Sequence, residues 1–322
     1  MALLLGVWGA GLAAPRETYA SEPALPTIPA QRLVLNSLSI FRYNPIGLET
    51  RARFGWQQKF YEGHHRATND NFWFAGTYLR LSPAGARAAA MVELQPVAMV
   101  HLRLTAEKLA YFGNFMFLQS RGSANDDLSD AAMKANAKGP QANYAGSGTH
   151  LSIEPRLQAA IGPIVVRNSA FFGYFDMGLR DGDRVWYEAT VDVPVPGRGW
   201  VFTNDLDVLL RRPMGAAMLT VGVRYSMVRP LYTGRDVSPV EDPDAAAARN
   251  DHHRVGLLAA YTLFDRGVGP YNKPTVLLMV QRYLDHRFRT GVGPHGVNGN
   301  IPYVVLGYAF ETDLLSPRSP LR

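Results

Sequence analysis

Cysteine is absent from the 322-residue chain. Without thiols, the protein forms neither disulfides nor thiolate-bound zinc or iron–sulfur clusters.

Long apolar runs are lacking too. After the N-terminal segment, no stretch reaches the roughly 18 uninterrupted apolar residues that a membrane-spanning helix requires, although 47% of the residues are hydrophobic. The formal charge of +6 includes no block of about five or six basic residues, so we expect no nucleic acid among the partners.

The N-terminal segment MALLLGVWGAGLAAP is apolar over a length typical of a signal-peptide core, although no Lys or Arg precedes the apolar run. We predict that residues 1–20 are a signal peptide, cleaved after Ala13 or Ala20. Residues 21–30 are expected to form an extended periplasmic lead-in, and residues 316–322 a C-terminal tail. The part between them, residues 31–315, is the predicted folded domain.

From Gln31 onward the hydrophobic pattern has a period of two. In MVHLRLTAEK (residues 99–108), apolar side chains alternate with polar ones; Val100, Leu102, Leu104 and Ala106 fall on one face, and His101, Arg103, Thr105 and Glu107 on the other. Successive side chains of a β-strand point to opposite faces, whereas a helix would scatter these charges around its axis. The segment is therefore predicted to be a strand.

The same alternation recurs along the chain, for example in residues 50–61, 149–158, 216–227 and 302–313. Runs of this length suit a tilted strand that crosses a bilayer, and aromatic residues gather near the run ends, as at residues 171–175. A soluble barrel would turn the apolar face inward. Here we predict an apolar outer face and a charged lumen. The predicted lumen-lining residues are Arg51, Arg53, Arg103, Glu107, Glu154, Arg156, Asp205, Asp207, Arg224 and Glu311.

Twelve strands are predicted, with ten or fourteen left open, because an even number returns both ends of the chain to the periplasm. Residues 184–195 are interpreted as part of an extracellular loop or hairpin. Parity assigns the tight SPAG turn (82–85) to the extracellular end and the polar loop after residue 61 to the periplasmic end, the reverse of what their lengths suggest. The strands are expected at 32–43, 48–61, 71–82, 86–95, 97–112, 148–160, 163–176, 199–211, 215–229, 254–265, 273–289 and 302–314.

Breaker-rich segments are expected to form the turns, namely 44–47, 82–85, 95–96, 161–163 and 211–215. The long polar segments 113–147 and 229–252 are each expected to carry a short helix. One strand conflicts with the pattern, because Arg282 shares the parity of lipid-facing residues. An Arg at mid-depth would cost roughly 2–4 kcal/mol, so we expect a bulge there or a position clear of the membrane.

With its signal-like start, alternating runs and Pro/Gly turns, the chain resembles bacterial outer-membrane β-barrel proteins of the porin-like kind over residues 31–315. It departs from them at the end, where Phe310 is followed by ETDLLSPRSPLR. The resemblance implies an all-β, antiparallel up-and-down transmembrane barrel in the cell outer membrane. Outer-membrane lipids and the barrel-assembly machinery are the implied partners, and small polar solutes or ions the implied cargo.

Passive passage of small polar solutes is the first functional hypothesis, and an open lumen and one closed by ion pairs both fit the sequence. An alternative is a lipid-directed enzyme. His150 and Ser152 have the spacing of the His-x-Ser pair of outer-membrane phospholipases and lipid A deacylases, but Ile153 replaces the usual Asn and the pair faces the predicted lumen. A third is a structural or adhesive barrel that acts through its long loops.

No cofactor or metal is expected. The sequence has two adjacent histidine pairs, His64-His65 and His252-His253. Neighbouring residues of a strand point in opposite directions and rarely chelate one ion together.

Overall fold

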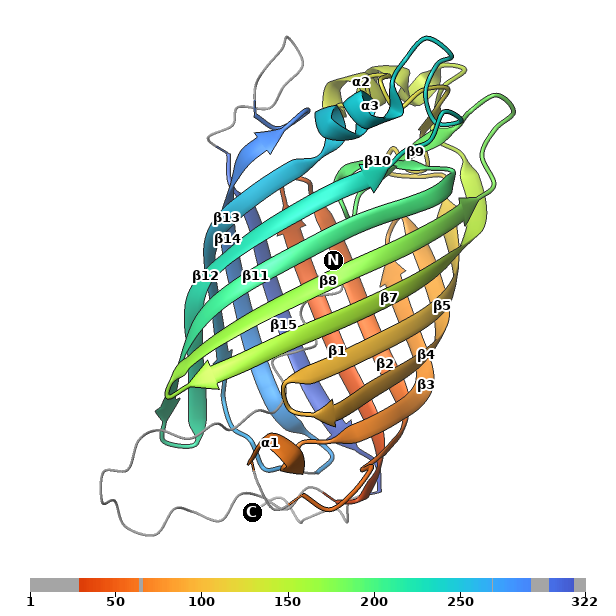
Figure 1. Ribbon diagram of the computed structural model, residues 1–322. Coiled ribbons are helices and arrows are strands. Elements are labelled where there is room, and N and C mark those ends of the chain that lie inside the picture. The colour runs from red at the N-terminus through yellow and green to blue at the C-terminus, as the bar shows by residue number, and fades with distance from the viewer. Residues whose placement is uncertain (1–28, 64–65, 268, 291–300, 316–322) are drawn as a thin grey trace.

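The computed structural model describes residues 29–63, 66–267, 269–290 and 301–315. Twelve antiparallel strands form one closed barrel, in which β1 (Gln31–Tyr43) pairs with β15 (Tyr303–Asp313). Each wall strand pairs with the next wall strand of the chain (Figure 1). The predicted all-β, up-and-down architecture and its strand number are confirmed. The predicted signal peptide and C-terminal tail lie outside the described residues.

The wall strands tilt across the barrel, as Figure 1 shows. The remaining ten are β2 (Gly47–Gln58), β3 (Phe72–Ser82), β4 (Gly85–Val97), β5 (Val100–Phe112), β7 (Ala145–Ile161), β8 (Ile164–Met177), β11 (Arg198–Met214), β12 (Ala217–Leu231), β13 (His252–Thr262) and β14 (Asn272–His286).

Two predicted turns are wrong in position. β4 continues through Gln95 and Pro96 to Val97, so the turn falls at residues 98–99. The register shifts between Leu94 and Val97, and such an irregularity accommodates a proline that cannot donate to the ladder. Likewise, β11 runs to Met214 and includes the proline of the predicted 211–215 turn.

The outer face of the barrel is apolar. The residues that alternate with the buried ones are exposed and large, among them Leu104, Leu151, Val208, Leu257 and Leu306. Soluble monomers rarely expose a continuous apolar surface of this kind, whereas a transmembrane barrel requires it. The chain is therefore a transmembrane β-barrel of the outer-membrane type. None of the described helices is long and apolar enough to span a membrane.

Arg282 is exposed on this outer face, opposite Val255 of β13. The register shift of the β13–β14 pair comes after Tyr283, so it does not move Arg282 to the lumen. β14 ends at His286, only four residues further on. Arg282 therefore lies near the end of the strand, where a long side chain can reach the interface, and the bulge explanation is wrong.

The long β5–β7, β8–β11 and β12–β13 connections gather at one end of the barrel, and the short β4–β5, β7–β8 and β11–β12 turns lie at the other (Figure 1). The helices α2 (Asp130–Ala135) and α3 (Pro243–Asn250) cover the long-loop end, and side chains of Ser129 and Asp242 cap them. Both helices were predicted. Short η1 (Asn136–Lys138) follows α2.

The two connections whose lengths conflicted with their assigned ends do lie at the ends that strand parity predicts. The 83–84 turn joins strands at the long-loop end, and the segment with α1 (Arg66–Asn69) lies at the other. We refer to the long-loop end as the outer end.

A separate three-stranded sheet is formed by β6 (Ser120–Arg121), β9 (Val185–Glu188) and β10 (Val193–Pro196). All residues of these three strands are buried. β9 and β10 form the hairpin that the sequence indicated for residues 184–195.

A charge placed at the middle of the outer face tests the membrane orientation. Leu206 lies midway along β11 and is 41% exposed. Leu206→Arg should lower the free energy of unfolding in lipid vesicles by roughly 2–4 kcal/mol. Arg282→Leu, the matched change near a strand end, should alter it by less than about 1 kcal/mol. Equal effects in denaturant titrations would contradict the depth assigned to the two sites.

Candidate functional site in the barrel interior

The β9–β10 hairpin, residues 185–196, lies inside the barrel and touches one wall through its tip. Arg42 of β1 donates to the Ala189 carbonyl oxygen at 2.8 Å. Arg87 of β4 forms an ion pair with Glu188 at 2.8 Å, and Tyr111 of β5 donates to the same carboxylate at 2.8 Å. We call residues 185–196 the bridging hairpin.

The other side of the tip contacts β13 and β14. His252 bonds to the Val191 carbonyl oxygen at 2.9 Å, and His286 to the Asp192 carbonyl oxygen at 2.8 Å. β4 and β13 stand six places apart in the ring of twelve strands, so they are opposite walls. The bridging hairpin therefore spans the interior.

Asp192 holds this arrangement together. Its backbone has a φ of 63°, a left-handed conformation that Asp tolerates better than most residues. Its carboxylate accepts hydrogen bonds from Tyr187, from Tyr283 at 2.7 Å and from Arg289 at 3.0 Å. Arg289 also pairs with Asp130 of α2. Through these contacts Asp192 joins the hairpin to the wall and to the loops of the outer end.

The side chain of Asp192 strongly favours its ionised form. Burial by itself raises the pKa of this carboxyl, but Arg289 and His286 together outweigh burial and hold the pKa well below its ordinary value. Asp192 is therefore an anion at neutral pH, where it forms its ion pair with Arg289.

The predicted lumen residues do point into the barrel. Eight are buried, and Glu154 and Arg156 are half-buried. The buried eight are Arg51, Arg53, Arg103, Glu107, Asp205, Asp207, Arg224 and Glu311.

Most of these charges are paired. Glu93 binds Arg53 at 2.9 Å and Arg103 at 2.8 Å, and Arg103 also reaches Glu154 at 3.4 Å. The other pairs follow the same pattern: Asp207 with Arg224 and Arg167 at 2.6 and 2.7 Å, Glu107 with Arg87 at 3.5 Å, Arg51 with Glu49, and Glu311 with Arg32. Arg156 contacts the His101 ring at 3.3 Å.

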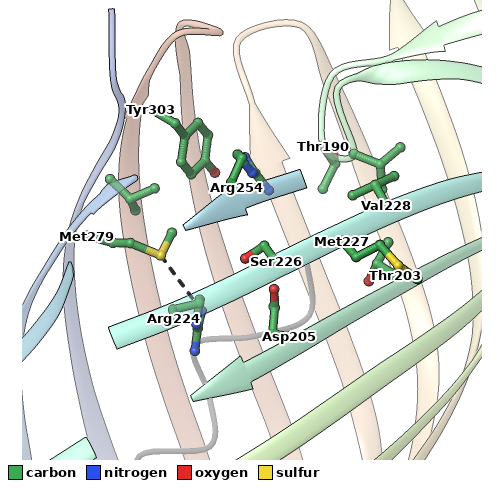
Figure 2. A pocket seen from close by; sticks show the side chains of 12 residues that line it. Thr190, Thr203, Asp205, Arg224, Ser226, Met227, Val228, Arg254, Met279 and Tyr303 are labelled. Carbon is green, nitrogen blue, oxygen red and sulfur yellow. Dashed lines mark hydrogen bonds between the residues drawn. The ribbon is translucent and has the colours of Figure 1, made fainter. Parts of the chain in front are cut away.

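Asp205 and Arg254 are different. Both are buried, on β11 and β13, and neither forms an ion pair with any other residue in the described part of the chain. Arg254 stacks over the Tyr303 ring at 4.1 Å. Figure 2 shows both side chains beside one small cavity of about 30 Å³, which Thr190 of the bridging hairpin also lines.

A second cavity of about 30 Å³ lies on the other side of the hairpin tip. Thr190 and Val191 line both cavities. The wall of the second one carries Arg103, Glu107 and Glu154. Each cavity has room for about one water molecule, and polar and apolar side chains line both, so the tip separates two small spaces of mixed lining.

Part of the lumen wall is apolar, which the sequence analysis did not predict. A buried cluster includes Leu38, Ile40, Met91, Leu258 and Leu277. These residues come from β1, β4, β13 and β14, whereas many of the charged groups lie on β5, β7 and β8. The same strands also carry buried charges, among them Glu93 of β4 and Arg254 of β13, so apolar and charged side chains are interspersed in the interior.

His150 and Ser152 are both buried within the barrel. The His150 Nδ1 atom contacts Glu107 at 3.1 Å, and the ring stacks on Phe175 with centroids 4.4 Å apart. The Ser152 hydroxyl donates to Glu154 at 3.3 Å instead of to His150. The two side chains therefore face the lumen, as predicted, and make separate interactions.

The histidines of the 252–253 pair diverge. His252 faces inward to the hairpin, whereas His253 bonds to the Tyr225 hydroxyl at 2.6 Å. Among the described residues no group of three or more potential ligands could hold a metal ion. His64 and His65 lie outside the described residues.

Sequence reasoning missed several interior groups. Glu49, Arg80, Arg87 and Glu93 have inward parity on β2, β3 and β4, so alternation within those strands was a sufficient signal. Asp192 had no such signal, because its role depends on a loop folding back into the barrel.

No family model matches the sequence, and no curated protein sequence does. Several solved outer-membrane structures have a similar fold. The β-domain of the Bordetella autotransporter BrkA is 12% identical, with a TM-score of 0.44 over 89% of this chain and 100% of that one. The NanC porin is 10% identical (TM-score 0.37; 87% and 100%), and OprD from Pseudomonas aeruginosa is 11% identical (TM-score 0.30; 90% and 94%). Identities this low concern the fold alone.

Removing the charge of Asp192 should release the bridging hairpin. Asp192→Asn keeps the left-handed backbone accessible but breaks the pair with Arg289, which should lower the free energy of unfolding by roughly 3 kcal/mol. Because the folded-state pKa of Asp192 is depressed, the wild-type advantage should persist from neutral pH to below the ordinary Asp pKa, and vanish only as pH falls through the depressed value.

Asp176→Asn is the matched control, since Asp176 pairs with Arg198 at an exposed site. It should change stability by less than about 1 kcal/mol. Urea unfolding across a pH series measures both variants. An Asp192→Asn effect no larger than that of the control, or one that disappears near neutral pH, would contradict the role of Asp192 in anchoring the bridging hairpin.

Proposed function

We propose that the chain is a narrow outer-membrane channel for small polar solutes or ions, constricted by the bridging hairpin. The observation that carries the proposal is the unpaired Asp205 and Arg254 beside a cavity under the hairpin tip. Leaving a buried charge without an ionic partner is costly. A barrel selected only for stability would pair or replace these groups, whereas a channel needs charges that face passing solutes.

The position of the two charges supports a selective passage. Asp205 and Arg254 lie on β11 and β13, with β12 between them, so charges of opposite sign face the same space. Such an arrangement creates an electric field across the cavity beside the bridging hairpin. The bridging hairpin limits the size of what passes, and the outer-membrane lipids and the barrel-assembly machinery are the proposed partners in the membrane.

Planar-bilayer recording of the refolded protein tests the proposal directly. Wild-type protein should give small stepwise currents. A variant with residues 188–192 replaced by a Gly-Ser segment of equal length should give larger currents, because the tip then loses its contacts to both walls. Silence of both proteins, despite correct folding by heat-modifiable gel migration, would exclude a channel.

Ion selectivity should respond to the two unpaired charges in opposite directions. Asp205→Asn should shift the permeability ratio toward anions, and Arg254→Gln toward cations. Each shift should be about two- to fivefold, the effect of one charge acting through water over several ångströms. Reversal potentials in a salt gradient measure it.

Lys108→Gln is the control, because Lys108 is exposed on the outer face of β5. It should leave the ratio unchanged. Shifts of the same sign for the two lumen variants, or shifts no larger than that of the control, would contradict the assignment of Asp205 and Arg254 to the ion path.

A further inference from the structure

A large cavity lies in the barrel wall at the outer end. Its volume is about 550 Å³, within the roughly 300–1,000 Å³ typical of pockets for small ligands. Its lining combines residues from both faces of the wall. Leu48 and Leu81 belong to the outer face, whereas Glu49 and Arg80 point inward. The cavity therefore connects the lipid side with the barrel interior.

Strand pairing explains the opening. The β1–β2 ladder continues to Arg42–Gly47 and the β3–β4 ladder to Ser82–Gly85. Between the two hairpins, however, the β2–β3 ladder ends at Thr50–Leu81. Three residues of β2, 47–49, thus extend beyond their ladder with β3, a length of roughly 10 Å. Side chains close the inner edge here, with Arg80 and Glu49 paired at 3.0 Å.

The entrance from the membrane side is apolar. Phe41, Leu48 and Leu81 are 43%, 53% and 57% exposed. Phe115 roofs the cavity and is 64% exposed, and its φ of 50° is a conformation that bulky residues seldom adopt. Asn114 donates to the Pro83 carbonyl oxygen at 3.0 Å and fixes this segment over the β3–β4 turn. An acyl chain in the surrounding leaflet meets a continuous apolar path.

The inner end and the rim are basic. Four basic side chains line the cavity, namely Arg42, Arg80, Arg87 and Lys134, against the two acidic ones Glu49 and Asp130. Lys134 is exposed in α2 and forms no ion pair within the described part of the chain. Arg80 and Arg87 are engaged by Glu49 and Glu188, so Lys134 is the basic group that favours a negative headgroup here.

We propose that this cavity binds a single-chain anionic amphiphile that enters from the surrounding membrane through the gap between the β1–β2 and β3–β4 hairpins. The acyl chain occupies the apolar entrance, and the headgroup lies near Lys134 and the arginines. Ala189 and Thr190 of the bridging hairpin form part of the inner wall, so the bound molecule sits directly against the constriction. The inference goes beyond the proposed channel and does not depend on it.

Titration with two amphiphiles of equal chain length tests the site. Protein in octyl glucoside is titrated with dodecanoate and, separately, with dodecyl maltoside, and bound molecules are counted by native mass spectrometry. We expect one dodecanoate per chain. Leu81→Trp should weaken dodecanoate binding by at least about tenfold, because the indole fills the entrance. Lys134→Glu should weaken dodecanoate binding and leave maltoside binding unchanged.

Leu210→Trp is the matched control, since Leu210 is 45% exposed on the outer face of β11, across the barrel from β3. It should bind dodecanoate like wild type, and Leu48→Trp supplies a second blocking variant if Leu81→Trp does not fold. Dodecanoate binding that neither entrance variant reduces would place the probe on the general lipid surface and overturn the site. Equal affinity for both amphiphiles, unchanged by Lys134→Glu, would overturn its anionic specificity.

Discussion

A sheet in a bilayer has no water to satisfy its edges, and this constraint governs the whole molecule. The pairing of β1 with β15 removes both edges and forces the side chains into two populations. Apolar residues face lipid, so the polar half of every alternating strand must turn inward. The interior then collects more ionisable groups than a soluble core would hold, and most of them have an ionic partner.

The partners come from two sources. Within the wall, inward residues pair with one another, as Glu93 of β4 does with Arg103 of the adjacent β5 and with Arg53 of β2. Toward the outer end the wall does not suffice, and the bridging hairpin supplies Glu188 and Asp192. The same hairpin therefore both neutralises the interior and narrows it. Stability and constriction are properties of one element, which is why Asp192 matters to both.

The barrel itself was predictable because its signal is local and repeated. Alternation along β5 or β12 fixes which residues face inward, and Pro or Gly marks most turns. Errors arose where a proline was tolerated within a strand, as at Pro96 beside a register shift. The partners of the inward charges were not predictable, because Arg53 and Glu93 lie on strands that are not adjacent and meet only across the curved interior.

The inward position of the bridging hairpin was even less predictable from the sequence. Its residues alternate as any strand does, and sequence pattern placed it in an outer loop. Its inward fold is set by Asp192 meeting Tyr283 and Arg289, contacts that join residues 91 and 97 positions apart. The lateral cavity arises because the β2–β3 ladder ends before the β1–β2 and β3–β4 ladders do. The sequence of a single strand does not encode this difference.

The inward position of the bridging hairpin is the central claim, and the absence of native cysteine makes it directly testable. Thr190 of the hairpin and Thr203 of β11 line the same cavity (Figure 2). With cysteine at both positions, a short thiol-to-thiol crosslinker should join them in membrane-embedded protein. Cysteines at Thr190 and at Thr77, exposed on β3, should not be joined. Equal crosslinking of the two pairs, or none in the first, would show that the hairpin lies outside the barrel.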